Sequence, residues 1–191
     1  MDLTPLGIQG AWLAESPIWK DNRGHFREWF KRDEVLSKTG IDFFVQQANI
    51  SQSQRGVIRG IHYSLAPEGQ AKWITCVQGS ILDVVVDLRP ESPTFKKHEI
   101  VDLNGNDGQA LLIGVGLGHG FLSLEDNTHT SYLLSSPYTP GFEYEIQPTD
   151  PELNINWHLE LIADLEVVIS EKDSQAPTLQ YRARRGQLPH F

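Results

Sequence analysis

The sequence predicts an all-β protein built as a sandwich or a barrel. Short runs of apolar and β-branched residues recur along the chain, separated by clusters of Gly, Pro, Asn and Asp that favour turns. There are roughly ten such runs and few helical patterns, which is typical of sandwiches and barrels. A small barrel can enclose one small ligand, so this fold class also predicts a cavity for polar side chains.

Length and composition favour one globular domain over residues 1–191, with a tail from about 174 to 191 that could be helical. The formal net charge of −9 disfavours nucleic-acid binding, which needs a basic face. The single cysteine, Cys76, excludes an internal disulfide and favours a reducing compartment. We see no signal-peptide pattern and no apolar run near the ~18 residues of a membrane span. We therefore expect a cytoplasmic protein that binds neither membrane nor nucleic acid.

The N-terminal part predicts two strands and a short helix. Residues 7–13 and 25–31 have strand patterns, and the sequence Asp21-Asn22-Arg23-Gly24 between them predicts a turn. Glu28 lies between two Phe residues on one face of the second strand, as a rim or a site residue. Residues 32–39 predict a helix that ends at the following glycine.

Residues 43–51 predict a strand with polar residues on one side. Gln47, Asn49 and Ser51 recur with the period of two that places side chains on a common face. This face is either exposed to solvent or forms the polar wall of a ligand cavity.

Residues 56–76 combine ionisable and apolar residues in a pattern that packing alone does not require. Arg59, His62 and Lys72 lie within fourteen positions, on two runs that read as neighbouring strands joined by a loop at 66–69. An imidazole flanked by two cations suits an anionic substrate and the transfer of a proton.

The alternative for His62 is a buried or edge histidine without chemical function. Strict alternation places Arg59 and His62 on opposite faces of a strand, which disfavours a shared site. A bulge at Gly60 or a strong strand twist would bring them together.

The middle of the chain predicts five further strands. Residues 80–88 are almost continuously apolar, which indicates burial on both faces. Shorter patterns follow at 95–103, 109–113, 118–124 and 129–135.

For two residues in these strands, the sequence allows both a structural and a functional role. His119 is a candidate metal ligand beside His62, but the chain has no His-x-His, no Glu-x-x-His and no second cysteine, so we do not expect a metal. Tyr132 is either a core residue or a site residue, and its hydroxyl needs a partner if it is buried. No phosphate loop or dinucleotide motif in βαβ context is present.

The motifs together resemble those of the dTDP-4-dehydrorhamnose 3,5-epimerases and related dTDP-4-keto-6-deoxyhexose epimerases. They occur in family order and span nearly the whole chain. They are Asp21-Asn22-Arg23-Gly24-His25-Phe26-Arg27-Glu28, Gln47-Ala48-Asn49-Ile50-Ser51, Arg59-Gly60-Ile61-His62-Tyr63, Gln70-Ala71-Lys72, Asp83-Val84-Val85-Val86-Asp87-Leu88-Arg89 with Ser92-Pro93-Thr94-Phe95, Gly118-His119-Gly120-Phe121, and Ser170-Glu171-Lys172-Asp173.

The resemblance implies a cupin-like jelly roll with short peripheral helices, usually a homodimer, that works without metal or cofactor. By motif, His62 is the base held by Asp173, Tyr132 is the acid on the opposite face of the sugar, and Lys72 lies near the C4 oxygen. The substrate-binding residues implied by the resemblance are Arg23, Glu28, Gln47, Asn49, Arg59, His119, Glu143 and Lys172, with Tyr138 stacked on the thymine.

This assignment is chemically consistent. C3 and C5 are both alpha to the C4 ketone, so each hydrogen can leave as a proton if the enolate is stabilised by a nearby cation. Inversion needs a base on one face and an acid on the other. The alternatives are a 3,4-ketoisomerase on the same scaffold, a non-catalytic nucleotide-sugar-binding cupin and a metal-dependent cupin oxygenase.

Two departures concern the identity of the sugar. Ser64 stands where the family usually has Gln, and residues 113–116 lack the usual Pro. Residues 114–119, followed by Leu124-Glu125-Asp126 and Ser131-Tyr132-Leu133-Leu134-Ser135, resemble epimerases of antibiotic deoxysugar pathways more than the rhamnose enzymes. They do not decide whether C3, C5 or both are inverted.

Overall fold

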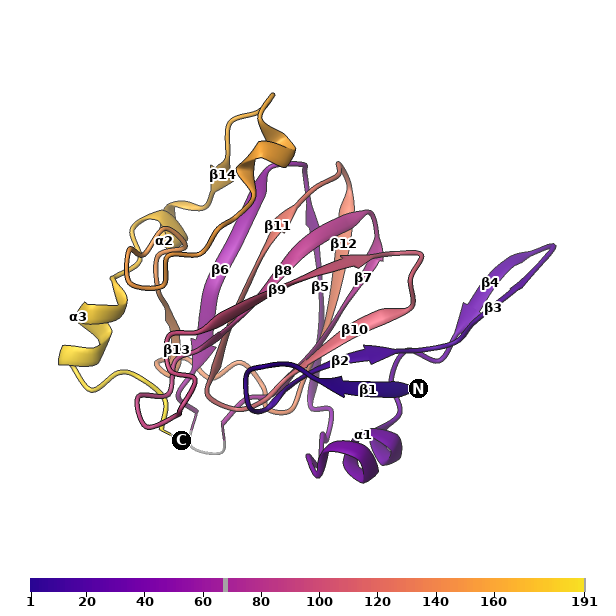
Figure 1. Ribbon diagram of the computed structural model, residues 1–191, viewed down its shortest axis with the longest axis horizontal. Helices are drawn as coiled ribbons and strands as arrows, with labels where there is room; N and C mark the ends of the chain where they lie inside the picture. The colour runs from indigo at the N-terminus through magenta and orange to yellow at the C-terminus, as the bar shows by residue number, and fades with distance from the viewer. Residues whose placement is uncertain (67–68, 191) are drawn as a thin grey trace.

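The computed structural model describes residues 1–66 and 69–190, and most of its strands form two six-stranded sheets packed face to face (Figure 1). The first sheet has the order β1 (Asp2–Pro5), β2 (Ala11–Glu15), β10 (Gln109–Ile113), β7 (Lys72–Gln78), β12 (Thr128–Leu134) and β5 (Gln47–Ser53). The second has the order β13 (Glu143–Glu145), β6 (Val57–Ser64), β11 (Leu117–Ser123), β8 (Ser80–Asp87) and β9 (His98–Asn104), and β14 (Val168–Ile169) adds to β6 in parallel. This jelly roll confirms the predicted all-β class.

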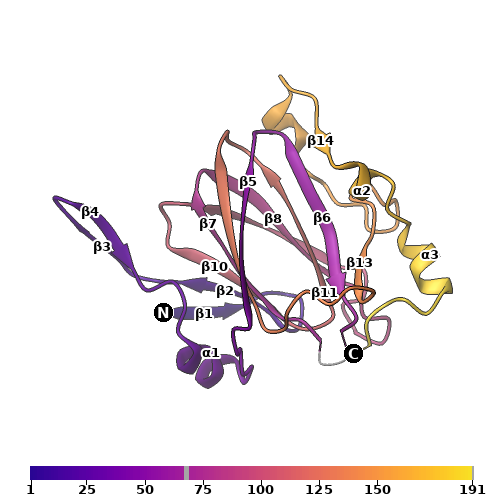
Figure 2. The same ribbon diagram turned by 180° about the vertical axis from the view of Figure 1, so that it is seen from behind.

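The helices are short and lie outside the sheets. They are α1 (Arg32–Thr39), the 3-10 helix η1 (Leu159–Ile162), α2 (Glu171–Ser174) and α3 (Leu179–Arg184). The views from both sides place α1 at the first sheet and the C-terminal helices along the second (Figures 1 and 2). Across the described part of the chain, no helix has the length and apolar character needed to cross a bilayer.

Strand β8 shows why residues 80–88 are nearly continuously apolar. Leu82 and Val84 pack in a cluster with Leu153 and Trp157 of the C-terminal segment, on the outer face of the second sheet. Ile81 and Val85 belong instead to the core between the two sheets. Both faces of β8 are buried, as predicted. Asp83 shares the inner face with Ile81 and Val85, because side chains alternate along a strand.

Helix α1 covers the outer face of the first sheet. Val35 is fully buried there in a cluster with Phe43, Trp73 and Leu112. The helix ends at Gly40, whose φ of 75° is left-handed and therefore suits glycine. This confirms the predicted helix and its end.

Several strand predictions are wrong in detail. Residues 56–76 do form two strands, but β6 and β7 are not neighbours: they lie in opposite sheets. Of the predicted loop at 66–69, residues 67 and 68 lie outside the described part. The predicted first strand at 7–13 begins later than expected: residues 7–10 form the turn between β1 and β2, and only residues 11–13 lie in β2.

The predicted strand at 25–31 is also shorter than expected. β4 (Gly24–Arg27) pairs only with β3 (Ile18–Asp21), and this hairpin projects from the body of the molecule (Figure 1). Glu28 follows the end of β4, so it does not share a strand face with the neighbouring Phe residues.

A buried ion pair fixes the turn after β8. The Asp87 carboxylate accepts hydrogen bonds from Arg89 Nε at 2.8 Å, Ser92 Oγ at 2.5 Å and Thr94 Oγ1 at 2.6 Å. Asp87 is fully buried and Arg89 nearly so. The motif from Asp87 to Phe95 therefore has a structural role.

We expect Asp87→Ala to lower the free energy of unfolding by about 3–5 kcal/mol, because it removes the carboxylate paired with the buried Arg89. Urea denaturation measures this. Asp102→Ala, which removes an exposed carboxylate from β9, is the control and should change stability by less than about 0.5 kcal/mol. Equal losses in the two variants would contradict the structural role of Asp87.

Candidate active site

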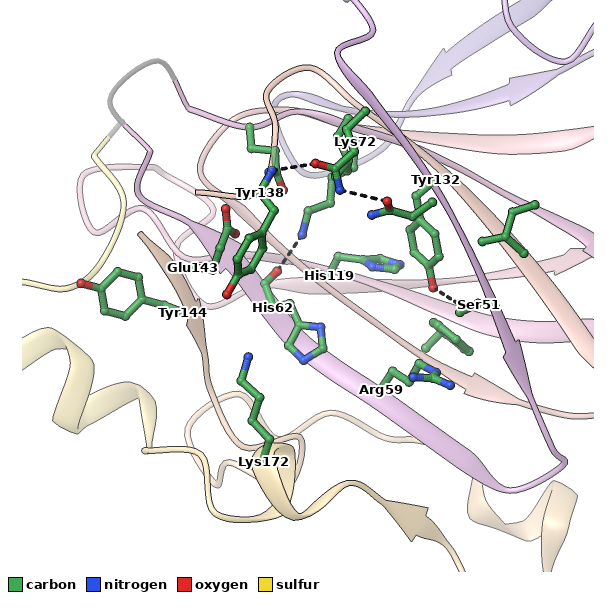
Figure 3. Close-up of a pocket in the computed structure, with 16 residues that line it drawn as sticks. Ser51, Arg59, His62, Lys72, His119, Tyr132, Tyr138, Glu143, Tyr144 and Lys172 are labelled. Carbon is green, nitrogen blue, oxygen red and sulfur yellow. Dashed lines mark hydrogen bonds between the residues drawn. The ribbon is translucent and has the colours of Figure 1, made fainter. Parts of the chain in front are cut away.

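A cavity of about 320 Å³ opens between the two sheets (Figure 3). Strands β5, β7 and β12 of the first sheet and β6, β11 and β13 of the second contribute to it. The lining residues are Gln47, Asn49, Ile50, Ser51, Arg59, His62, Gln70, Lys72, His119, Phe121, Tyr132, Leu134, Tyr138, Glu143, Tyr144 and Lys172. The polar face of β5 is therefore the wall of a cavity, which settles the alternative left open by the sequence.

A bulge in β6 brings Arg59 and His62 to the same cavity. His119 on β11 lies opposite His62, and Phe121 lies opposite Arg59, so two steps along β11 face three steps along β6. Gly60 lies in this bulge with a φ of 127°. A Cβ atom at Gly60 would lie 2.5 Å from the Gly120 Cα, so both conformation and space require glycine.

His62 is held by a buried carboxylate. Its Nε2 lies 2.7 Å from Asp173 Oδ1, and the other carboxylate oxygen accepts a hydrogen bond from the Gly60 backbone N–H at 3.3 Å. The Ser170 hydroxyl caps α2 by accepting from the Asp173 backbone N–H, which fixes the position of the carboxylate. Burial raises the pKa of Asp173, but the hydrogen bonds from His62 and Gly60 outweigh it, so the pKa lies below its ordinary value.

Lys72 reaches the same cavity from the opposite sheet. Its Nζ donates a hydrogen bond to the His62 backbone carbonyl at 3.1 Å. Burial lowers the pKa of Lys72 to about 8, although Glu143 and Asp83 raise it in part. The ammonium is therefore the main form below pH 8, in a place where little water screens its charge.

Tyr132 enters the cavity from β12, on the sheet opposite to His62 (Figure 3). Its hydroxyl lies 3.1 Å from Ser51 Oγ. Its ring packs edge-on against His119, with 6.0 Å between ring centroids. Burial raises the pKa of the Tyr132 phenol, and the Ser51 hydrogen bond only partly offsets this.

His119 forms a second histidine–carboxylate pair. Its Nε2 lies 2.9 Å from Asp83 Oδ2, and both side chains are buried. Burial lowers the pKa of His119, while Asp83 raises it in part. Over residues 1–66 and 69–190, no group of three or more His, Cys, Asp or Glu side chains is arranged to hold a metal ion.

The loop after β12 is fixed over the cavity by side chains from both sheets. The Tyr138 backbone N–H donates to Gln47 Oε1 at 2.8 Å, and the Thr139 N–H donates to Glu143 Oε1 at 3.2 Å. Ser64 Oγ donates to the same Glu143 oxygen at 3.2 Å. Tyr138 remains 60% exposed, with its ring at the cavity mouth.

Most of the predicted site residues meet in this cavity. Those that line it are His62, Lys72, Tyr132, Gln47, Asn49, Arg59, His119, Tyr138, Glu143 and Lys172, and Asp173 lies behind His62. Two do not reach it within this chain. Arg23 pairs with Asp21 at the exposed tip of the hairpin, and Glu28 pairs with Lys31 at 2.6 Å.

Several residues of the site had no predicted role. Asp83 is a carboxylate in an otherwise largely apolar strand, which is a signal for a buried partner that the sequence alone did not identify as His119. The sequence placed Ser51 on the polar face of β5 but did not predict a function for it. Tyr144 left no signal; it lines the cavity and stacks on Tyr63 at 5.8 Å.

Comparison with known proteins agrees with this geometry. Residues 5–181 match the model of the dTDP-4-dehydrorhamnose 3,5-epimerase family.

The chain belongs to this family.

Relatives within the dTDP-4-dehydrorhamnose 3,5-epimerase family are similar over nearly their whole length. A dTDP-4-dehydro-6-deoxyglucose 3-epimerase from Streptomyces bikiniensis is 45% identical over 187 residues, which cover 98% of this chain and 93% of the relative. A dTDP-4-dehydrorhamnose 3,5-epimerase from Streptomyces griseus is 42% identical over 189 residues, covering 99% and 92%. These matches confirm the predicted epimerase class.

Solved structures confirm the predicted cupin-like jelly roll. An epimerase from Mycobacterium tuberculosis superimposes with a TM-score of 0.96 at 39% identity, covering 100% of this chain and 94% of that one. A 3'-monoepimerase from Streptomyces bikiniensis, in complex with dTDP-quinovose, superimposes with a TM-score of 0.91 at 45% identity, covering 98% and 92%.

We expect the side-chain amine of Lys72 to titrate near pH 8 in ¹⁵N NMR of lysine-labelled protein, because burial disfavours its charged form. Lys72→Met assigns the resonance. Glu143→Gln should lower this pKa further, since the Glu143 carboxylate raises it. A Lys72 pKa near the ordinary lysine value of about 10.4, or no response to Glu143→Gln, would contradict the buried, Glu143-facing position.

Proposed function

We propose that the chain inverts C3, C5 or both in a dTDP-4-keto-6-deoxyhexose, by removing a proton alpha to the C4 ketone and returning one from the opposite face. The observation that carries this proposal is the position of His62 and Tyr132, which enter one cavity from opposite sheets. We also retain the predictions of one functional domain and of a cytoplasmic location.

His62 is the base in this proposal. Its Nε2 is engaged by Asp173, so Nδ1 is the ring nitrogen that takes the proton from carbon. Asp173 holds the ring in this tautomer and supports the imidazolium that forms.

Lys72 and Tyr132 complete the reaction. When the C–H proton leaves, the electron pair moves into an enolate whose charge falls largely on the C4 oxygen. The buried Lys72 ammonium stabilises that charge more than it would in water. The Tyr132 phenol then gives its proton to the other face of the same carbon.

The remaining cavity residues suit a nucleotide sugar. Arg59 and Lys172 supply positive charge for the diphosphate. Gln47, Asn49, His119 and Glu143 supply polar groups for the sugar and nucleoside, and Tyr138 offers an exposed ring for the thymine. Solved relatives in complex with dTDP-quinovose and with dTDP-4-keto-L-rhamnose support this substrate class.

We expect His62→Ala to lower kcat about 10³-fold on dTDP-4-keto-6-deoxyglucose, since a positioned base contributes an effect of this order. Product formation is followed by proton NMR of the sugar ring. His129→Ala, on β12 but outside the cavity lining, is the matched control and should keep full activity. Undiminished turnover by the His62 variant would overturn the proposal, and a product with its carbonyl at C3 would point to a ketoisomerase.

We further propose that the enzyme is a homodimer in which the β3–β4 hairpin of one copy completes the cavity of the other. The hairpin projects from its own chain and exposes Trp19 and Phe26 at 50% and 64%. Strand β5 is the last strand of its sheet, and it exposes Ile50 at 74% beside the cavity. A hairpin from a second copy would place Trp19 and Phe26 against this edge and carry Arg23 to the substrate.

The trans arrangement predicts complementation between two defective variants. Arg23→Ala should raise KM about 10-fold with kcat little changed, whereas Arg184→Ala, exposed on α3, should change neither. A mixture of Arg23→Ala and His62→Ala, refolded together, should regain sites with normal KM, because the Arg23→Ala subunit then receives an intact hairpin. A monomer by light scattering, or no recovery in the mixture, would contradict this arrangement.

A further inference from the structure

Ser51 lines the cavity and contacts Tyr132, but it has no role in the proposed reaction as described above. It lies on β5, opposite Thr130 in the register with β12, while Asn49 lies opposite Tyr132. The Ser51 side chain is thus diagonal to Tyr132 across the two strands, and its Oγ lies 3.1 Å from the phenol oxygen. Both side chains line the cavity, and Ser51 is half-buried.

The Tyr132 phenol needs such a partner if it is the acid. Once it has given up its proton it is a phenolate, and burial disfavours that charge, as the raised pKa of Tyr132 indicates. The contact with His119 is made by the ring rather than by the hydroxyl. A hydroxyl can both accept from the phenol and, after rotation, donate to the phenolate.

We propose that Ser51 is a positioning residue for Tyr132: it aims the phenol into the cavity, donates its O–H to the phenolate, and passes a proton from water back to it. This inference rests on the proposed function.

Atoms and charges balance over one turnover. His62 takes the proton from carbon, and the electron pair enters the enolate. The phenol O–H breaks as the new C–H bond forms. The phenolate then takes the Ser51 proton while Ser51 takes one from water, and His62 releases its proton to water.

The enolate has two fates, and Ser51 should affect only one of them. Return of a proton from His62 restores the original configuration, with solvent exchange at that carbon. Delivery from Tyr132 inverts it. A residue that acts through Tyr132 therefore changes the ratio of inversion to exchange, whereas general damage to the cavity lowers both rates.

The test follows dTDP-4-keto-6-deoxyglucose in deuterated water by proton NMR, with separate rates for inversion and for exchange with retention. Ser51→Ala should lower inversion about 10-fold, the effect of one hydrogen bond in the transition state, and leave exchange within about twofold. Ser51→Thr, which keeps the hydroxyl, should restore most of the inversion. Tyr132→Phe sets the limit of exchange without inversion.

Ser131→Ala is the matched control, because Ser131 neighbours Tyr132 in sequence on β12 but lies outside the cavity lining. It should leave both rates unchanged. A parallel fall of both rates in Ser51→Ala, an unchanged ratio, or failure of Ser51→Thr to recover inversion would overturn the role of Ser51. Wild-type protein that neither inverts nor exchanges would instead overturn the proposed function, and this inference with it.

Discussion

The close approach of two glycines organises the whole site. Gly60 and Gly120 face each other across β6 and β11, where any Cβ would meet backbone atoms within 3 Å. This contact accommodates one additional residue in β6, which turns Arg59 and His62 to the same side. The Gly60 N–H in the same bulge also holds the Asp173 carboxylate that orients His62. The positions of His62, of the Asp173 carboxylate and of Arg59 thus depend on one local backbone geometry.

The buried carboxylates at the cavity each have a histidine partner, although the chain is acidic overall. Buried Asp173 and Asp83 each bond to a histidine, at 2.7 and 2.9 Å, so neither carboxylate is left alone in a poorly solvated place. Lys72 reaches the cavity from β7 of the first sheet and is buried there. Its pKa is lowered because burial removes the water that would stabilise its charge. A cavity of this kind stabilises a developing oxyanion because its charges are fixed before the reaction begins.

Residue patterns were sufficient to predict the all-β class, the helix ending at Gly40 and the double burial of β8, because each depends on local periodicity or on one capping residue. The placement of β6 and β7 in opposite sheets was not predictable, since both strands read alike and pairing is decided by long-range packing. The partner of Asp83 was missed for the same reason. The motifs predicted most of the cavity lining, but nothing in the sequence showed that Arg23 would project away from the cavity of its own chain.

In the proposed reaction, each inverted carbon loses a proton to His62 and gains another from the opposite face. The most direct measurement is the deuterium content and configuration of the product when the wild-type protein converts dTDP-4-keto-6-deoxyglucose in deuterated water. We expect one solvent deuteron at each inverted carbon, C3, C5 or both, and none at C2. An inverted carbon that retains its original hydrogen, or a cavity that binds the sugar nucleotide without exchange, would contradict the proposed proton transfers.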